Sequence, residues 1–170
     1  MALIKSVRGF TPVIPENCFL ADNATIIGDV VMGDDCSIWF NAVIRGDVNS
    51  IRLGDRVNIQ DGAVIHCTLD KSKSILGNDV SVGHNAIIHG CTIHDEVLVG
   101  MGAIVMDLAV VESHCLIAAG AVVLESAHLE SGWIYGGIPA KKIKPLDAQN
   151  MDFFIKRTSE NYVKYSSWYK

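Results

Sequence analysis

Three histidines in the middle of the sequence are candidate ligands of a metal ion. His66 lies in the segment VIHCT, and His84 and His89 lie five residues apart in the segment VGHNAIIHG. Three imidazoles are sufficient protein ligands for a catalytic zinc, which keeps a fourth position open. A spacing of five residues, however, places His84 and His89 on one face of neither a helix nor a strand. The elements around them therefore decide whether the three imidazoles can reach one ion.

Aliphatic residues recur at intervals of six around and before these histidines. Leu20, Ile26, Met32, Ile38 and Ile44 form one unbroken series, and a small or aliphatic residue lies two positions before each. Within each pair the alternation is that of a β-strand, and Gly, Asp and Asn between the pairs favour turns. Six residues thus supply one short strand and one turn, and stacked units of this kind form a solenoid. An ordinary β-sandwich would not keep one period over so many repeats.

The repeat resembles the hexapeptide signature of left-handed parallel β-helix proteins, in which three hexads make one triangular coil of about 18 residues. The resemblance implies an all-β solenoid, and it alone supplies the handedness, because crossovers between parallel strands are usually right-handed. A coil of this length sorts the aliphatic residues into three columns if loops bulge near GDVNSIR and near CTLDKSKSI. The columns are Leu20, Ile38, Ile59, Val82, Val99 and Ile117; Ile26, Ile44, Ile65, Ile88, Val105 and Val123; and Met32, Leu53, Leu76, Ile93, Val111 and Leu129.

The end of the chain changes character. The segment GGIPAKKIKP predicts a linker over residues 135–146, after a β-helix domain over residues 1–134. Residues 147–170 predict an amphipathic α-helix with Asp147 as its N-cap. We expect its stripe to pack along the outside of the β-helix, so that the whole forms a single domain. The stripe comprises Met151, Phe154, Ile155, Thr158, Tyr162, Tyr165 and Tyr169.

The composition narrows the class of protein. A net charge of −5 gives no reason to expect nucleic-acid binding. The most apolar stretch is interrupted by Asp107, Glu112 and His114, which disfavours a membrane span. Five cysteines without paired spacing fit a reducing compartment better than a disulfide framework, and nothing suggests secretion. We therefore expect a cytoplasmic protein that acts on a small-molecule substrate.

The columns show where the three histidines lie. His66 and His89 each follow an aliphatic residue of the same column in adjacent coils, so they should stack about 4.8 Å apart and face outward. Two imidazoles at this spacing can share a metal ion. His84 belongs to a different column, at the other end of a strand from His89, and five extended residues span roughly 16 Å. Either His84 is unrelated to the pair or it comes from a neighbouring molecule.

Three copies around a threefold axis would bring the histidines together. Each copy would set the edge that carries His66 and His89 against the edge of the next copy that carries His84. Cyclic closure through such a heterologous interface generates three identical sites. We therefore expect a homotrimer whose metal sites are shared between subunits.

Several segments together resemble the γ-class carbonic anhydrase family. They are the hexad core, IRGDV, NIQDGAVIHC, VGHNAIIHGC, GGIPAKKIK and the C-terminal helix, which cover essentially the whole chain. The resemblance implies a metal held by His66 and His89 of one subunit and His84 of the next. It implies zinc, with iron or cobalt as alternatives, and the reversible hydration of CO2 to bicarbonate by metal-bound hydroxide.

The resemblance also assigns roles to charged neighbours of the histidines. Arg45 shares the column of His66, Asp47 follows two residues later, and Asp61 lies one coil before His84. The resemblance implies that Arg45, Asp47 and Asp61 form an ion-pair network between subunits. Such a network would favour one alignment of the subunits and one oligomeric state. Solvated surface charges are the alternative interpretation.

Four further polar residues are candidates by the same resemblance. Gln60 would orient the metal-bound hydroxide, and Asn58 would support Gln60; both face outward on their strand. A plain ladder of amides between coils remains the alternative for this pair. Tyr162, with Asn161 beside it, would reach the metal pocket from the C-terminal helix, although a tyrosine on an apolar stripe more often packs.

The sequence departs from the family prototype in the residues that move protons. The prototype carries two glutamates near the site, whereas this chain has Val48 at one position and CTLDKSKS at the other. Proton transfer would then fall to buffer, Asp70 or Tyr162, and weak or absent activity is compatible with this. Two alternatives stay open: an acetyl-CoA-dependent hexapeptide acyltransferase, which GGIPAKKIK resembles and which needs a histidine base but no metal, and a non-catalytic metal-binding homologue.

Overall fold

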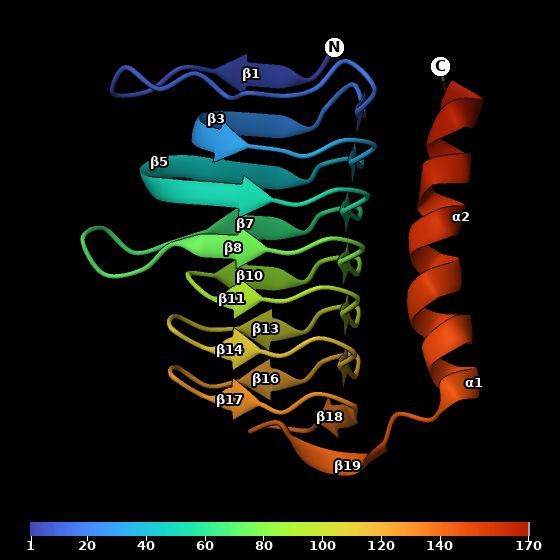
Figure 1. The fold of residues 1–170 in the computed structure, drawn as a ribbon. Coiled ribbons are helices and arrows are strands. Elements are labelled where there is room, and N and C mark those ends of the chain that lie inside the picture. Colours follow the sequence, from blue (N-terminus) through green and yellow to red (C-terminus); the bar gives the residue numbers. More distant parts are fainter. Residues whose placement is uncertain (170) are drawn as a thin grey trace.

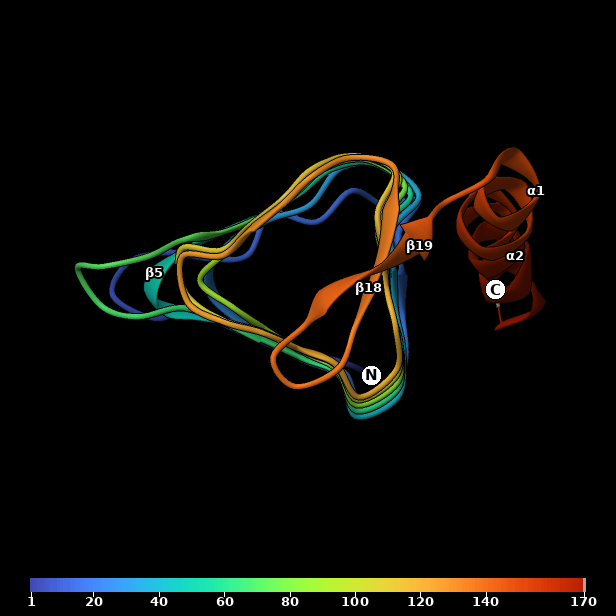
Figure 2. The same cartoon turned by 90° about the horizontal axis from the view of Figure 1, so that it is seen from below.

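The computed structural model describes residues 1–169, and most of this length winds into a left-handed solenoid of parallel β-strands. Figure 1 shows the coils stacked one below another, with a single helical segment standing beside them. Figure 2 looks along the stack and shows the triangular outline of the coils. The predicted left-handed parallel β-helix with a C-terminal helix is confirmed.

The strands form the three faces of the triangle. One face is an eight-stranded sheet of β2 (Phe19–Leu20), β4 (Ser37–Ile38), β6 (Asn58–Ile59), β9 (Ser81–Val82), β12 (Leu98–Val99), β15 (Leu116–Ile117), β18 (Trp133–Gly136) and β19 (Lys141–Pro145). A second face holds β1 (Leu3–Lys5), the first part of β3 (Thr25–Val31) and of β5 (Val43–Leu53), β7 (Val64–His66), β10 (Ile87–His89), β13 (Ile104–Val105) and β16 (Val122–Val123). The third face holds the rest of β3 and β5, then β8 (Ser74–Leu76), β11 (Thr92–Ile93), β14 (Val110–Val111) and β17 (His128–Leu129).

The register of the sheets matches the predicted columns. Ile65 pairs with Ile88 across the inserted loop, and Val99 pairs with Ile117, 18 residues later, as the columns predict. Almost all members of the three columns are buried in one continuous core. Leu20, in the first coil, is only half-buried because no complete coil lies above it.

The corners that connect the faces turn through left-handed backbone conformations. At the corner before β10, Asn85 has φ of 56°, and the residues stacked on either side of it are Gly62 at 69° and Gly102 at 65°. Asn and Gly tolerate this region better than other residues, which is why they recur at the corners. His84 immediately precedes Asn85, so a stacked turn fixes its position.

The two predicted bulges are present at a single corner. β5 runs without interruption through the first, and the loop between β7 and β8 forms the second. In Figure 2 both project beyond the outline of the other coils. The extra residues therefore leave the columns in register on either side.

The C-terminal helical segment runs back along the eight-stranded face toward the first coils (Figure 1). It consists of α1 (Ala148–Asn150), a π-helical stretch (Met151–Lys156), α2 (Arg157–Ser166) and a final 3₁₀ turn (Ser167–Tyr169). Asp147 caps it as predicted, because its carboxylate accepts a hydrogen bond from the Asn150 amide. The last predicted helical residue, Lys170, lies outside the described residues.

The π-helical stretch changes which residues face the solenoid. Ile155, Ser159 and Ser166 are buried, whereas Phe154 and Tyr169 of the predicted stripe are exposed. A π turn holds more residues than an α turn, so a stripe drawn at steps of three and four drifts off the contact. The helical segment packs against the outside of the solenoid, and Ser159, which the predicted stripe omits, is buried there. Tyr169, although exposed, still packs its ring against Phe19 and Trp39, with ring centres 5.3 and 5.6 Å apart.

Residues 135–146, expected as a linker, include β19, which pairs antiparallel with β18 at the last coil. All five residues of β19 are exposed, and three of them are lysines. The proposed division at residues 134 and 146 stays a prediction. Within residues 1–169 all five cysteines are free, and no described helix is long and apolar enough to cross a membrane.

Two neighbours on β8 test the inward and outward assignment. Leu76 is 2% exposed and Ile75 is 42% exposed. We expect Leu76→Ala to lower the free energy of unfolding by about 2 to 5 kcal/mol, because it leaves a cavity in the stacked core. Ile75→Ala should lower it by less than about 1 kcal/mol. Denaturant titration of both variants measures the difference, and equal losses would contradict the assignment.

A hydrogen bond from the helix to an ion pair of the solenoid anchors the helix. Both carboxylate oxygens of Asp79 accept hydrogen bonds from Arg56, at 2.8 and 2.7 Å, and Oδ1 also accepts one from Ser159 of α2 at 2.7 Å. Burial alone would raise the pKa of Asp79, but the hydrogen bonds from Arg56 and Ser159 outweigh it and lower that pKa from its ordinary 3.8. The folded state therefore prefers the ionised carboxylate.

This preference predicts a pH dependence of stability. Because the folded pKa of Asp79 is depressed, its contribution is complete above pH 3.8 and is lost as the pH falls through the folded pKa. Asp79→Asn should flatten the fall of unfolding free energy below about pH 4. Asp152→Asn removes an exposed carboxylate from the helical segment that contacts Asp79 and serves as the control. It should keep the wild-type dependence of unfolding free energy on pH.

Candidate functional site

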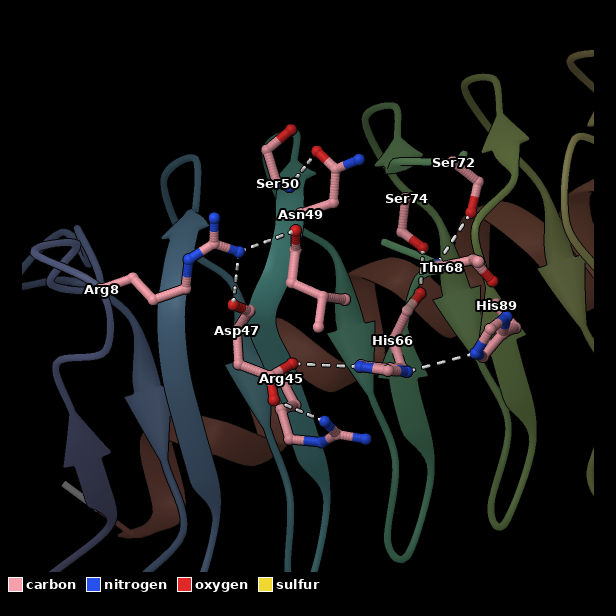
Figure 3. A network of polar contacts seen from close by, with 11 residues as sticks. Arg8, Arg45, Asp47, Asn49, Ser50, His66, Thr68, Ser72, Ser74 and His89 are labelled. Atoms are coloured by element: carbon pink, nitrogen blue, oxygen red, sulfur yellow. Dashed lines mark hydrogen bonds and ion pairs between the residues drawn. The ribbon is translucent and has the colours of Figure 1, made fainter. Parts of the chain in front are cut away.

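His66 and His89 face each other at the ends of two neighbouring strands. β7 and β10 pair in parallel with His66 opposite His89, as the column analysis predicts. Nδ1 of His66 lies 3.2 Å from Nε2 of His89 (Figure 3). Their side chains are 17% and 33% exposed, so the pair is open to the surface at one side.

The geometry of the pair fits a metal ion. Two nitrogens bound at about 2.0 to 2.1 Å in a tetrahedral arrangement lie about 3.4 Å apart, close to the observed separation. The second ring nitrogen of each histidine contacts a carboxylate at 3.1 Å, Asp47 for His66 and Asp107 for His89. Metal-binding histidines characteristically have such a partner, which fixes the ring orientation. Burial lowers the pKa of His66 and so favours the neutral imidazole that binds metals.

Arg45 and Asp47 extend this arrangement along β5. Nη1 of Arg45 donates to Oδ2 of Asp47 at 2.6 Å, while Oδ1 of the same carboxylate contacts His66 (Figure 3). Burial alone would raise the pKa of Asp47, but the hydrogen bonds from Arg45 and His66 outweigh it and hold that pKa below its ordinary value. The structure thus brings Arg45, Asp47, His66 and His89 together in one chain of polar contacts.

Sequence analysis missed Asp107, the carboxylate on His89. Its side chain is also held by hydrogen bonds from Ser72 and Thr68 of the loop between β7 and β8. A signal was present in the columns, because Asp107 follows Gly46, Cys67 and Gly90 at one slot of successive coils. Cys67 itself is buried, and burial raises the pKa of its thiol, which disfavours a thiolate ligand at this slot.

His84 lies apart from the pair, in the corner turn that precedes β10. Its Nδ1 is 2.9 Å from Oδ2 of Asp61, one coil earlier, so the predicted stacking of these two residues is confirmed. Among residues 1–169 of one chain, no three His, Cys, Asp or Glu side chains gather closely enough to hold a metal. One chain therefore carries two facing histidines at one corner and a third histidine at another corner.

A carboxylate beside a histidine does not by itself mark the site. His114 lies 3.1 Å from Glu96, and His128 lies 2.8 Å from Glu112, elsewhere on the solenoid. These histidines have no facing imidazole among the described residues. The face-to-face pair of His66 and His89 is the distinguishing feature.

His84 lines a cleft between the eight-stranded face and the helix. The cleft has a volume of about 710 Å³, and its walls are mostly apolar. Gln60 and Tyr162 line it beside His84, which brings three of the predicted site residues together. Sequence analysis missed the cleft because it depends on how far the helix stands from the sheet. Its floor is made by small residues in successive coils, Gly83, Gly100, Ala118 and Ala119.

Gln60 and Asn58 lie at outward positions of the face along which the helical segment runs, and both are buried. Nδ2 of Asn58 donates to Ser81 at 2.7 Å, and Nε2 of Gln60 donates to Oδ1 of Asn58 at 3.0 Å. This directional chain leaves the amide oxygen of Gln60 to accept a hydrogen bond in the cleft. These contacts form the ladder that the sequence offered as one alternative, and the orienting role of Gln60 stays a prediction.

Tyr162 packs its ring edge-on against Trp39, with ring centres 5.2 Å apart, while it also lines the cleft. Burial, together with the charge of Asp61 and the nearby Tyr165, raises the pKa of Tyr162 to about 12. Its phenol therefore stays protonated at neutral pH and can donate a hydrogen bond. Asn161 lies beside it on α2, half-buried, and is not among the described residues that line the cleft.

Comparison with known proteins identifies the family to which the chain belongs. Residues 11–46 match the family of bacterial transferase hexapeptide repeats. A carbonic anhydrase of Geobacillus kaustophilus is 37% identical over 99% of this chain and 91% of its own length. The mitochondrial γ carbonic anhydrase 2 of Arabidopsis thaliana is 39% identical over 90% of this chain, but the chain spans only 56% of that protein's length.

A solved structure agrees with the fold over nearly the whole chain. A Bacillus cereus protein described as an acetyltransferase is 39% identical, with a TM-score of 0.96 over 99% of this chain and 96% of that chain. Sequence identity at this level, over almost the full length of the bacterial relative, establishes kinship rather than a shared scaffold alone. Together with the paired histidines at adjacent coils, it shows that the chain belongs to the γ-class carbonic anhydrase-like family of hexapeptide-repeat proteins.

Proposed function

We propose that three copies of this chain form a trimer with three zinc sites, each held by His66 and His89 of one subunit and His84 of the partner subunit. The observation that carries the proposal is the facing pair of imidazoles, 3.2 Å apart, each with a carboxylate on its other nitrogen. The third ligand must come from another chain because His84 lies at a different corner. Iron or cobalt can take the same three nitrogen ligands.

The proposed reaction is the hydration of CO2 to bicarbonate. A zinc held by three neutral imidazoles would supply a water-derived nucleophile for the carbon of CO2 near neutral pH. The amide oxygen of Gln60, which faces the cleft as a hydrogen-bond acceptor, would orient a hydroxyl group there. Asn58 holds Gln60 in this orientation through the chain that ends at Ser81.

Charged residues at the two corners would meet in the same trimer. Arg45 and Asp47 lie next to His66, and Asp61 lies next to His84. If the corners face each other, Arg45 is placed between its own Asp47 and Asp61 of the partner subunit. Such a network favours one register of assembly more surely than it adds net stability.

The proton route is the weak step of this mechanism. Val48 and the loop between β7 and β8 supply none of the prototype's glutamates. A phenol with a pKa of about 12 stays protonated and cannot accept a proton at neutral pH, so Tyr162, beside Asn161, would donate a hydrogen bond in the cleft and would not take up the proton. We assign the transfer to buffer or to the exposed Asp70, and we expect slow turnover. The five free cysteines support a cytoplasmic location.

An acyltransferase is the second candidate, favoured by the acetyltransferase description of the Bacillus cereus relative. That chemistry needs a histidine base and no metal. A metal-binding protein without catalysis is the third. Metal analysis of the purified protein separates the second candidate from the others, and CO2 hydration on the same sample separates the first from the third.

Metal content tests the ligands. We expect about one zinc per chain in the wild-type protein. His66→Ala, His84→Ala and His89→Ala should each lose it while the solenoid stays folded, because all three side chains point outward and leave no core cavity. His128→Ala, which removes an exposed histidine with a carboxylate partner, is the matched control and should keep the metal. Unchanged zinc in any of the three variants would refute that ligand.

Mixing two variants tests whether each site is shared. His84→Ala and His66→Ala are dissociated, mixed in equal amounts and reassembled. Every mixed trimer then contains one interface with all three ligands, so about a quarter of wild-type zinc and activity should return. If all ligands came from one chain, mixing would restore nothing. Near-zero recovery in a sample shown by mass to contain mixed trimers would disprove the intersubunit site.

A further inference from the structure

Asp107 connects His89 to a loop that the periodic solenoid does not require. Its Oδ2 lies 3.1 Å from Nδ1 of His89, and its Oδ1 accepts a hydrogen bond from the hydroxyl of Ser72. Ser72 belongs to the inserted loop between β7 and β8. Both Ser72 and Asp107 are buried, at 3% and 9% exposed, although the loop itself projects from the corner.

The hydroxyl of Ser72 is fixed from both sides. It accepts a hydrogen bond from the backbone amide of Thr68 at 3.0 Å while it donates to Asp107 (Figure 3 shows Thr68 and Ser72). The backbone amide of Thr68 uses a lone pair of the hydroxyl oxygen, and the single hydroxyl proton is donated to Asp107. The carboxylate is thus held at a defined distance from His89 by the fold of the loop.

Gly90 leaves the space in which this contact forms. A Cβ atom added there would collide with Oγ of Ser72 and with Oδ1 of Asp107. Gly90 also has a φ of 65°, which glycine adopts without strain. The residue directly after His89 therefore lacks a side chain where the serine and the carboxylate meet.

Ser74, the first residue of β8 directly after the loop, joins the two histidine strands. Its hydroxyl donates to the carbonyl of His66 at 2.6 Å and accepts from the amide of Gly90 at 2.9 Å. The strand that ends the loop is thus tied to the backbone of both histidine strands, and the loop itself reaches His89 through Ser72 and Asp107.

We propose that Asp107 is a positioning residue for the metal ligand His89, and that the insertion between β7 and β8 holds Asp107 in place through Ser72. The proposal rests on the zinc site proposed above. Asp107 has the same relation to His89 as Asp47 has to His66, but its anchor is the serine of a loop, whereas Asp47 is anchored by Arg45 of its own strand.

Zinc affinity of the purified trimer, measured by competition with a chelator, tests the proposal. Removing the partner of a metal-binding histidine commonly weakens affinity about 10- to 100-fold, and we expect this for Asp107→Ala. Ser72→Ala should weaken it about two- to tenfold, the effect of one hydrogen bond. Glu112→Ala removes the carboxylate beside His128, away from the site, and should leave zinc affinity within about threefold of wild type.

The double variant distinguishes positioning from general loosening. Because Ser72 acts through Asp107, Ser72→Ala should have no further effect on zinc affinity in an Asp107→Ala background. Thermal unfolding of the zinc-free proteins reports structural damage separately, and the visible spectrum of the cobalt-substituted trimers reports the ligand geometry. We expect a changed cobalt spectrum in Asp107→Ala and an unchanged one in Glu112→Ala.

The outcomes separate this proposal from the one on which it depends. A wild-type protein that binds no zinc overturns both. A wild-type protein that binds zinc, with Asp107→Ala bound as tightly, overturns only the role of Asp107. Effects of Ser72→Ala and Asp107→Ala that simply add would overturn the route through the loop.

Discussion

The structure depends on one constraint, the backbone hydrogen bonding of each coil to the next. Parallel strands at about 4.8 Å give every side chain a neighbour of the same orientation one coil away. Two histidines in the same column therefore lie within reach of one ion without any special loop. The same spacing places Arg45 beside His66 and Asp61 beside His84, so the polar residues fall into two columns at two corners.

This constraint treats the inside and the outside of the coils differently. Inward positions are limited to aliphatic and small residues, because each must fit the residue above and below it. Outward positions are free until another element covers them. The helix covers the outward face of β6, and the buried amides of Asn58 and Gln60 are tolerated there because they bond to each other and to Ser81. The hydrogen-bonded side chains of Gln60, Asn58 and Ser81 therefore form an ordered polar row beside the cleft.

Periodicity decides which parts of this arrangement the sequence could predict. The columns, the histidine pair, the cap at Asp147 and both bulges follow from spacing and from residue type, and the structure agrees with them. The π-helical stretch breaks the period of the helix, so the sequence could not predict that Ser159 is buried and Phe154 is exposed. Contacts of Asp107 with Ser72 depend on how a non-periodic loop folds. The cleft depends on the distance between two elements, which no repeat encodes.

The last coil has a further consequence for the molecule as a whole. A solenoid of parallel strands ends in a row of free backbone groups, onto which the first coil of another copy could stack indefinitely. β19 occupies that row by pairing with β18 in the opposite direction, and its exposed lysines surround the edge with positive charge. A strand that reverses direction offers no template for another parallel coil. β19 thus prevents copies of the chain from stacking end to end into fibres at this end of the solenoid.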